Sequence, residues 1–485
     1  MRVVIVGAGM VGTQLSRHLI QEKHDISLIE ADEERARHAS NRLDCLVIHD
    51  EGNSMASLEE AGIARADALV CVTDSDELNM IICGLAESRY PKLLKIARVR
   101  NDDYGDLFLQ EHAPSGGERL LGIDYFVYPD VEAARSVLDA IEHGALGDVL
   151  AFPNTPYVLG SVDIAAKSAF DGLVLKDFRS LVKEDCLITL VERRGESLLP
   201  TGSTVLKGDD RIRILAKEEE MDRIYRLAGR TERPLRKIGI VGGGRLGTLI
   251  AEGLLEQREE KNFLSFLKAL NPQNRRRVII IEDNYNLCKE LASRFPEALI
   301  LNEDISDESF VAEERIDDLD LIITATNHQE LNMIAAIYLK SRGVGRAIAM
   351  VTGSGYAAIA RQLGVDVVIP MKSVVVDSIL SHLMGGGVTG VHRIGEDGLV
   401  DIIEIKIEKG SPAAEKKITE LNLPGGGLVM LVNRPVLPVE QEAGRSPPES
   451  FIPRGDYVFK GGDRIILIAK NENKAEIDRF FGASL

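Results

Sequence analysis

The sequence contains one series of motifs twice, and this duplication restricts the possible folds more than any other feature of the chain. The repeated segments are VVIVGAGMVG at 3–12 with IGIVGGGRLG at 238–247, ELNM at 77–80 and 330–333, and KGDDRIRILA at 207–216 with KGGDRIILIA at 460–469. Because the motifs keep their order, we expect two copies of one structural unit. The second copy carries an insertion within residues 257–274.

Each copy divides into two blocks with different patterns. The leading blocks, residues 1–144 and 234–388, alternate short apolar runs rich in β-branched residues with helical patterns. Strands that are buried on both faces and separated by helices indicate a doubly wound parallel sheet, so each leading block is predicted to be a Rossmann-like α/β domain. The trailing blocks, residues 145–230 and 389–485, are predicted to be small α+β modules. The strands expected in the first leading block are residues 3–6, 26–30, 45–49, 68–73, 95–100 and 125–128.

A helix is predicted to connect the two blocks of each copy. It follows Pro129 and ends at Gly144 in the first copy, and it follows Pro370 and ends at Gly385 in the second. Its apolar face can pack on its own sheet or form a dimer contact, and we favour the dimer contact because the helix leaves the sheet domain. Repeated contact surfaces of this kind favour closed symmetric assembly, so we expect a homotetramer.

The composition excludes several classes of partner. Lys and Arg number 58 against 76 Asp and Glu, a net charge of −18, which opposes nucleic acid and anionic lipid. The five cysteines form no CxxC pair, as expected for a reduced cytosolic protein without structural zinc. No apolar run approaches the roughly 18 residues of a membrane-spanning helix, and the amino terminus lacks a secretory signal. We therefore expect a cytoplasmic protein that reaches a membrane only through a partner, without a lipid anchor of its own.

Gly7, Gly9 and Gly12 form a GxGxxG motif between the first strand and the first helix. In that context the glycines allow a tight turn, close approach of backbone amides to a pyrophosphate, and close packing of helix on strand. Glu30 ends the second strand, where a carboxylate accepts hydrogen bonds from a ribose diol and repels a 2′-phosphate. The motif predicts NAD(H) or an adenosine nucleotide, and a strand-turn-helix without ligand is the alternative.

The second copy repeats the loop with Gly242, Gly244 and Gly247 and supplies Glu282 as its acid. The greater distance between loop and acid follows from the insertion, which can also cover the pocket. A loop without a ligand is therefore a stronger alternative in this copy.

Other candidate ligand contacts stand at strand ends, where an open α/β sheet binds its ligand. In the first copy they are Asp50, Thr73, Asp74, Arg98 and Arg100; the aligned residues of the second copy are Glu303 or Asp304, Thr326, Met350 and Thr352. Arginine can clamp phosphates through paired donors, and both arginines are missing from the second copy. We therefore expect the first site to bind nucleotide more tightly. The alternative is that Arg98 and Arg100 pair with Asp102 or Asp103.

Catalytic machinery is not evident. No histidine recurs at equivalent points of the two copies, and no nucleophile elbow, HExxH motif or P-loop lysine is present. We expect a ligand-gated regulator rather than an enzyme, with no metal site. The alternative is an NAD-dependent oxidoreductase with duplicated cofactor domains.

Several segments resemble a known family. GAGMVG with Glu30, AGIARADALVCVTDSDELN at 61–79 and ARVR at 97–100 resemble the RCK (KTN) nucleotide-binding domain. RRGESLLPTGSTVLKGDDRI at 193–212 and FIPRGDYVFKGGDRI at 451–465 resemble the RCK C-terminal module. Two tandem pairs resemble the family of peripheral regulatory subunits of Trk-type potassium uptake systems.

The resemblance implies that four chains form a cytosolic ring beneath a TrkH- or TrkG-type potassium-translocating membrane subunit. It also implies that the ring gates that subunit in response to NAD(H) and to ATP or ADP. In the first copy the implied contacts are Gly7, Ala8, Gly9, Met10, Val11 and Gly12 with phosphates, Glu30 with ribose, Asp50 and Glu51 near adenine, and Thr73, Asp74, Arg98 and Arg100 on the far phosphate or nicotinamide side. In the second copy they are Gly242, Gly244, Arg245, Leu246, Gly247, Glu282, Asp304 and Thr326.

Overall fold

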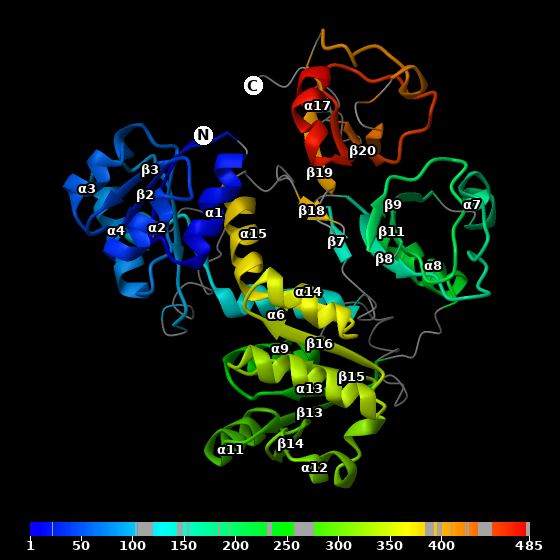
Figure 1. Ribbon diagram of the computed structural model, residues 1–485. Helices are drawn as coiled ribbons and strands as arrows, with labels where there is room; N and C mark the ends of the chain where they lie inside the picture. The colour runs from blue at the N-terminus through cyan, green and yellow to red at the C-terminus, as the bar shows by residue number, and fades with distance from the viewer. Residues whose placement is uncertain are drawn as a thin grey trace, which may run out of the picture. The chain divides into compact units, whose positions relative to one another are not determined.

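The computed structural model of the chain forms two units, each built from both copies. The first contains Met1–Ile141 and Leu235–Gly385, and the second contains Glu142–Pro234 and Gly386–Leu485. The two leading blocks thus belong to one unit and the two trailing blocks to the other (Figure 1). The structure describes residues 1–21, 23–101, 104, 120–142, 149–152, 155–182, 185–193, 195–229, 235–256, 276–383, 392–394, 400–408, 410–421, 423, 426–434 and 449–481.

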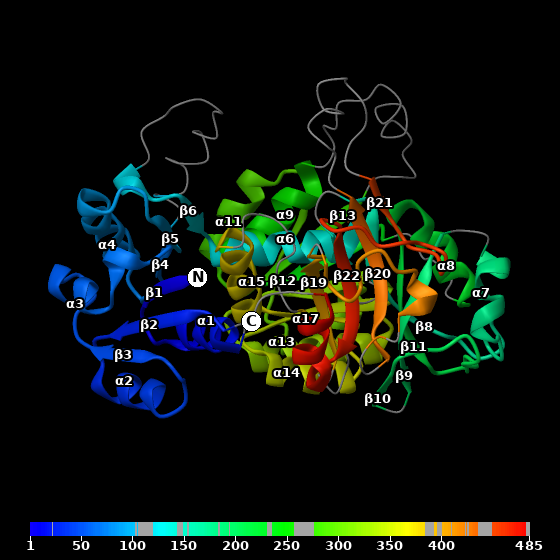
Figure 2. The same cartoon turned by 90° about the horizontal axis from the view of Figure 1, so that it is seen from above.

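The first leading block is a doubly wound sheet of six parallel strands in the order β3-β2-β1-β4-β5-β6, as Figure 2 shows. Apolar side chains on both faces of the strands form two buried clusters, which confirms the predicted fold class. Its elements are β1 (Arg2–Val6), α1 (Met10–Gln21), β2 (Asp25–Glu30), α2 (Glu33–Ser40), β3 (Leu46–His49), α3 (Met55–Glu60), β4 (Ala68–Cys71), α4 (Asp76–Arg89), β5 (Leu94–Arg98) and β6 (Tyr125–Val127).

The second leading block repeats this topology, with strand order β14-β13-β12-β15-β16-β17 and parallel pairing throughout. The insertion expected within 257–274 lies outside the described residues. The elements are β12 (Lys237–Val241), α9 (Arg245–Glu256), β13 (Arg277–Glu282), α11 (Tyr285–Arg294), β14 (Leu299–Asn302), α12 (Glu308–Glu313), β15 (Leu321–Thr324), α13 (Gln329–Arg342), β16 (Arg346–Val351), α14 (Ser354–Gln362) and β17 (Val367–Pro370).

Each trailing block contains a five-stranded sheet with antiparallel pairing, in the orders β10-β9-β11-β8-β7 and β18-β19-β22-β20-β21. Side chains from both sheets, including Leu190 and Leu431, form one hydrophobic cluster, so the two modules share a core. The elements are β7 (Val149–Ala151), β8 (Tyr157–Asp163), α7 (Leu175–Val182), β9 (Leu187–Arg193), β10 (Glu196–Leu198), β11 (Arg211–Lys217), α8 (Met221–Leu227), β18 (His392–Ile394), β19 (Val400–Lys406), β20 (Leu428–Arg434), β21 (Glu449–Phe451), β22 (Arg464–Lys470) and α17 (Lys474–Phe481).

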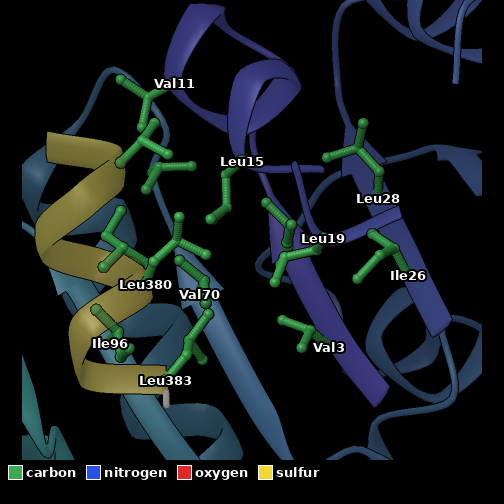
Figure 3. Packing of buried hydrophobic residues seen from close by; sticks show 14 of the residues in the cluster. Val3, Val11, Leu15, Leu19, Ile26, Leu28, Val70, Ile96, Leu380 and Leu383 are labelled. Atoms are coloured by element: carbon green, nitrogen blue, oxygen red, sulfur yellow. The ribbon is translucent and has the colours of Figure 1, made fainter. Parts of the chain in front are cut away.

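The connecting helices, α6 (Pro129–Glu142) and α15 (Met371–Leu383), each contact the sheet domain of the other copy. On α15, Ile379 and Leu380 are buried in the same cluster as Leu15 and Leu19 of α1, and Figure 3 shows α15 lying beside these side chains. On α6, Leu138 lies so close to Gly253 of α9 that an added Cβ there would stand 2.2 Å from it.

Neither expectation specified this exchange of helices within one chain. Each helix forms a contact between copies, but the two copies belong to one chain. The two sheet domains are therefore joined by a reciprocal contact.

Glu404 on β19 gives the second trailing module a pH-dependent stability. Its side chain is 6% exposed and lies 4.0 Å from the guanidinium of Arg464. Burial raises the pKa of Glu404 to about 7, from an ordinary 4.5, although Arg464 opposes the shift. The folded chain thus holds a proton that the unfolded chain releases, so stability falls as pH rises from about 4.5 to about 7.

We expect Glu404→Gln to stabilise the module at pH 8 by up to about 3 kcal/mol and to leave its stability at pH 4 nearly unchanged. Denaturant unfolding at the two pH values measures the difference. Glu408→Gln, at an exposed position, is the matched control. Equal unfolding midpoints for Glu404→Gln and the wild type at pH 8 would show that the carboxylate is solvated.

Candidate nucleotide-binding sites

The first and third glycines of each loop are required by the fold itself. Gly7 has φ of +105°, and its N–H donates to the carbonyl oxygen of Ile29 at 2.8 Å. A Cβ on Gly12 would stand 1.9 Å from the Gly7 carbonyl oxygen. The second loop is the same, with φ of +99° at Gly242 and 1.9 Å between a Cβ on Gly247 and the Gly242 oxygen. Any side chain at the third position would open the turn.

The middle glycines are not explained by packing within the chain. A Cβ added at Gly9 or at Gly244 would meet no atom of the described residues within 4 Å. The space beside these glycines lies at the N-termini of α1 and α9, where amides without helical partners face outward. Met10, the first residue of α1, is 66% exposed, whereas Val11 turns into the core. This geometry suits a phosphate group, which needs close backbone approach.

Glu30 and Glu282 are placed beside the loops and hold them. The Glu30 carboxylate is buried and accepts hydrogen bonds from the N–H groups of Ala8, at 2.5 Å, and Asp32, at 3.0 Å. Glu282 accepts from Gly243 and Asn284 at 2.7 and 2.9 Å. Each acid thus bridges the glycine loop and the end of the second strand. A ribose diol would use the lone pairs that these amides leave open.

Asp50 and Asp304 follow β3 and β14, at the same sheet edge as the loops. Asp50 accepts from the Ser57 hydroxyl at 2.5 Å and from the N–H of Glu51 at 2.8 Å, and the Ser57 bond is the main cause of its lowered pKa. Asp304 accepts from the hydroxyl and N–H of Ser306, which also lower its pKa. Both aspartates therefore remain ionised and shape their own turns.

Arg98 and Arg100 are held by the turn that follows β4. The Arg98 guanidinium donates to the carbonyl oxygen of Thr73 at 2.7 Å and to the Asp74 carboxylate at 3.2 Å. Arg100 donates to the Asp74 carbonyl oxygen, and its Nε lies 3.6 Å from the Asp76 carboxylate. These partners differ from Asp102 and Asp103, which lie outside the described residues. The arginines position the 73–76 turn.

The Asp74 carboxylate pairs with arginines from two elements, Arg98 of β5 and Arg35 of α2. The guanidinium of Arg35 lies 3.3 Å from this carboxylate. Burial alone would raise the pKa of Asp74, but the hydrogen bonds from Arg35 and Arg98 lower it overall. In the second copy Met350 is buried, and the N–H of Thr352 donates to Gln329 instead. The charged network thus belongs to the first copy.

Comparison with known protein families accounts for both blocks. Residues 3–116 and 238–370 match the TrkA-N domain. Residues 159–229 and 402–482 match the TrkA-C domain. The chain belongs to the TrkA family.

TrkA relatives align over nearly the full length. The Trk system potassium uptake protein TrkA of Halomonas elongata is 27% identical over 497 residues, covering 100% of this chain and 99% of the relative. TrkA homolog 1 of Methanosarcina mazei is 27% identical over 487 residues, covering 99% and 100%. Among solved structures, the GsuK channel covers 100% of this chain and 79% of its own, with TM-score 0.55 and 18% identity. The GsuK channel bound to NAD gives 0.54 and 17%. These structures share the fold.

In both TrkA-N domains a buried asparagine joins two strand ends, which motif analysis missed. The amide of Asn79 accepts from the N–H of Thr73 at 2.9 Å and donates to the Arg98 carbonyl at 2.9 Å. Asn332 makes the same bonds with Thr326 and Met350, at 2.9 and 3.1 Å. The repeat of ELNM was the available signal, since an identical polar residue within a helical pattern suggests a shared structural task.

None of the helices in the described part of the chain has the length and hydropathy of a membrane-spanning segment.

Proposed function

We propose that the chain is a nucleotide-sensing regulatory subunit that gates a Trk-type potassium uptake system. The full-length relatives carry that name, and a structure with the same fold is a channel bound to NAD. The observation that carries the proposal is the open approach to Gly9 and Gly244, beside helix N-termini and buried acids. A chain without a ligand at these loops has no steric need for a glycine at either position.

The ligand is NAD(H), with ATP or ADP sharing the same phosphate and ribose contacts. Glu30 and Glu282 favour a free ribose diol, because a 2′-phosphate would add negative charge beside a carboxylate that the loop already holds. Asp50 and Asp304 lie at the same edge, toward the adenine end of such a ligand.

Ligand binding can change the relation between the copies because the glycine loops lead directly into the exchanged contact. Helix α1 begins at the first loop and packs against α15 of the second copy. A phosphate bound at the start of α1 therefore acts on a helix that contacts both its own sheet and α15 of the second copy. A coupling of about 1 to 3 kcal/mol changes affinity between two states by roughly 5- to 150-fold, which is sufficient for gating.

The partner is a TrkH- or TrkG-type membrane subunit, on whose cytoplasmic side four chains form the ring. Helices α6 and α15 are used within the chain, so assembly requires other surfaces. Ile81 on α4 and Ile334 on α13 occupy equivalent positions of the repeat and are 52% and 65% exposed. They offer each sheet domain an apolar contact point.

Incubation of the purified chain with NADH and a panel of oxo acids tests the proposal. We expect saturable NADH binding without oxidation, and light scattering should report a tetramer. Steady oxidation of NADH with any oxo acid would favour the oxidoreductase alternative and contradict the regulatory function.

A further inference from the structure

The exchanged helices begin beside the glycine loops of the opposite copy. Lys372, the second residue of α15, places its ammonium 2.6 Å from the sulfur of Met10, which is the first residue of α1. Four residues along α1, the Gln14 amide donates to the hydroxyl of Ser373 at 3.4 Å. The start of α15 is thus fixed against the start of α1, and a lysine of the second copy stands at the first nucleotide loop.

Lys372 has no counter-ion among the described residues. It forms no ion pair with any residue in the part of the chain that the structure describes, and its ammonium donates to the thioether of Met10, which accepts hydrogen bonds weakly. Partial burial lowers its pKa. The N-terminus of α1 adds a positive helix dipole to the same place. Two positive groups side by side, next to the open face of Gly9, favour an anion at this place.

The second loop has the opposite arrangement. Arg245, the equivalent of Met10, begins α9 and supplies the cation from within the loop. Its Nε lies 3.5 Å from the carboxylate of Asp130, the second residue of α6 from the first copy. The two exchanged helices therefore bring opposite charges: α15 places Lys372 at the first loop, and α6 places Asp130 at the second. A phosphate at the second loop would compete with Asp130.

We propose that Lys372 is a phosphate-contacting residue of the first nucleotide site, supplied by the second copy, and that Asp130 weakens phosphate binding at the second site. This inference rests on the proposed function and assigns the two sites different ligand preferences. The first site favours nucleotides with a di- or triphosphate. The lysine has a flexible four-carbon stem, so its ammonium can turn from Met10 to a phosphate beside Gly9.

Calorimetric titration of ADP into the full chain tests the assignment. A Gly244→Val background leaves only the first site to be measured, and a Gly9→Val background leaves only the second. In the Gly244→Val background we expect Lys372→Met to weaken ADP binding about tenfold or more, because a charged contact to phosphate is lost. Lys372→Arg should keep most of the affinity, and Lys92→Met, at an exposed position, should change nothing. In the Gly9→Val background, Asp130→Asn should tighten ADP binding several-fold.

If Lys372→Met melts at the same temperature as its parent and binds ADP with unchanged affinity, this inference is wrong, but the proposed function is not affected. A parent chain that takes up neither ADP nor NADH would overturn the proposed function as well. If Lys372→Met does not fold, Lys372→Gln and Asp130→Asn decide the question by the same titrations. An Asp130→Asn variant with unchanged or weaker ADP binding at the second site contradicts the role given to Asp130.

Discussion

Gly12→Ala should unfold the first sheet domain, whereas Gly9→Val should leave it folded and abolish its nucleotide binding. The alanine Cβ would stand 1.9 Å from the Gly7 carbonyl oxygen, a backbone atom that cannot move without opening the turn. Overpacking against rigid neighbours costs about 3 kcal/mol or more when nothing can give. A Cβ added at Gly9 meets no atom of the described residues within 4 Å, so we expect the valine to take up the space proposed for a phosphate without disturbing the fold.

Thermal unfolding followed by circular dichroism, with limited proteolysis to locate the unfolded domain, measures this contrast. Gly247→Ala and Gly244→Val form the matched pair in the second copy, with the same 1.9 Å clash and the same open space. If Gly12→Ala melts like the wild type, or if Gly9→Val is the less stable of the pair, the loop geometry described above is wrong.

Ile379→Ala should destabilise the first copy although the residue belongs to the second. Ile379 is fully buried in the cluster that contains Val3 and Ile5 of β1 and Leu15 of α1. Truncating a buried isoleucine to alanine costs about 2 to 5 kcal/mol, depending on how far the cavity collapses. The loss should fall on the domain that surrounds the side chain rather than on the domain that precedes it in sequence.

Hydrogen exchange resolved by residue locates the loss. We expect reduced protection in β1 and α1 of Ile379→Ala. The control is Ile359→Ala on α14, which is 50% exposed and should change stability by less than about 0.5 kcal/mol. Protection that is lost only within residues 238–370 would show that α15 packs on its own sheet.

The sheet domains were predictable from sequence because their signals are local. β-branched runs separated by helical patterns predicted both parallel sheets, and the strand expected at 68–73 forms as Ala68–Cys71. The glycine motif predicted the turn between β1 and α1, since a Cβ on Gly12 would stand 1.9 Å from the carbonyl oxygen of Gly7, only five residues earlier.

The destination of the connecting helices was not predictable from the same signals. An amphipathic pattern shows that α15 must bury Val376 and Ile379, but it does not identify the surface that receives them. That surface lies on α1, more than 350 residues earlier in the sequence. Leu138 and Gly253 pose the same problem for α6, because neither residue is distinctive alone.

The partners of Arg98 and Arg100 were missed for a related reason. The sequence offered Asp102 and Asp103, which lie outside the described residues, and gave no sign of the contacts with Asp74 and Asp76. Parallel pairing of β4 with β5 brings the turn after one strand beside the end of the next. The role of Glu30 was also predicted only in part. Its spacing from the glycine loop indicated a ribose contact, but gave no sign that its carboxylate accepts a hydrogen bond from the Ala8 amide.

Titration of NADH into the 485-residue chain and into the Gly9→Val/Gly244→Val double variant shows whether the glycine loops bind nucleotide. We expect saturable binding to the wild type without oxidation, tighter at the first site, and loss of that binding in a double variant that melts like the wild type. Absence of NADH binding to the wild type, or equal binding to the double variant, would contradict the claim that the glycine loops are nucleotide sensors.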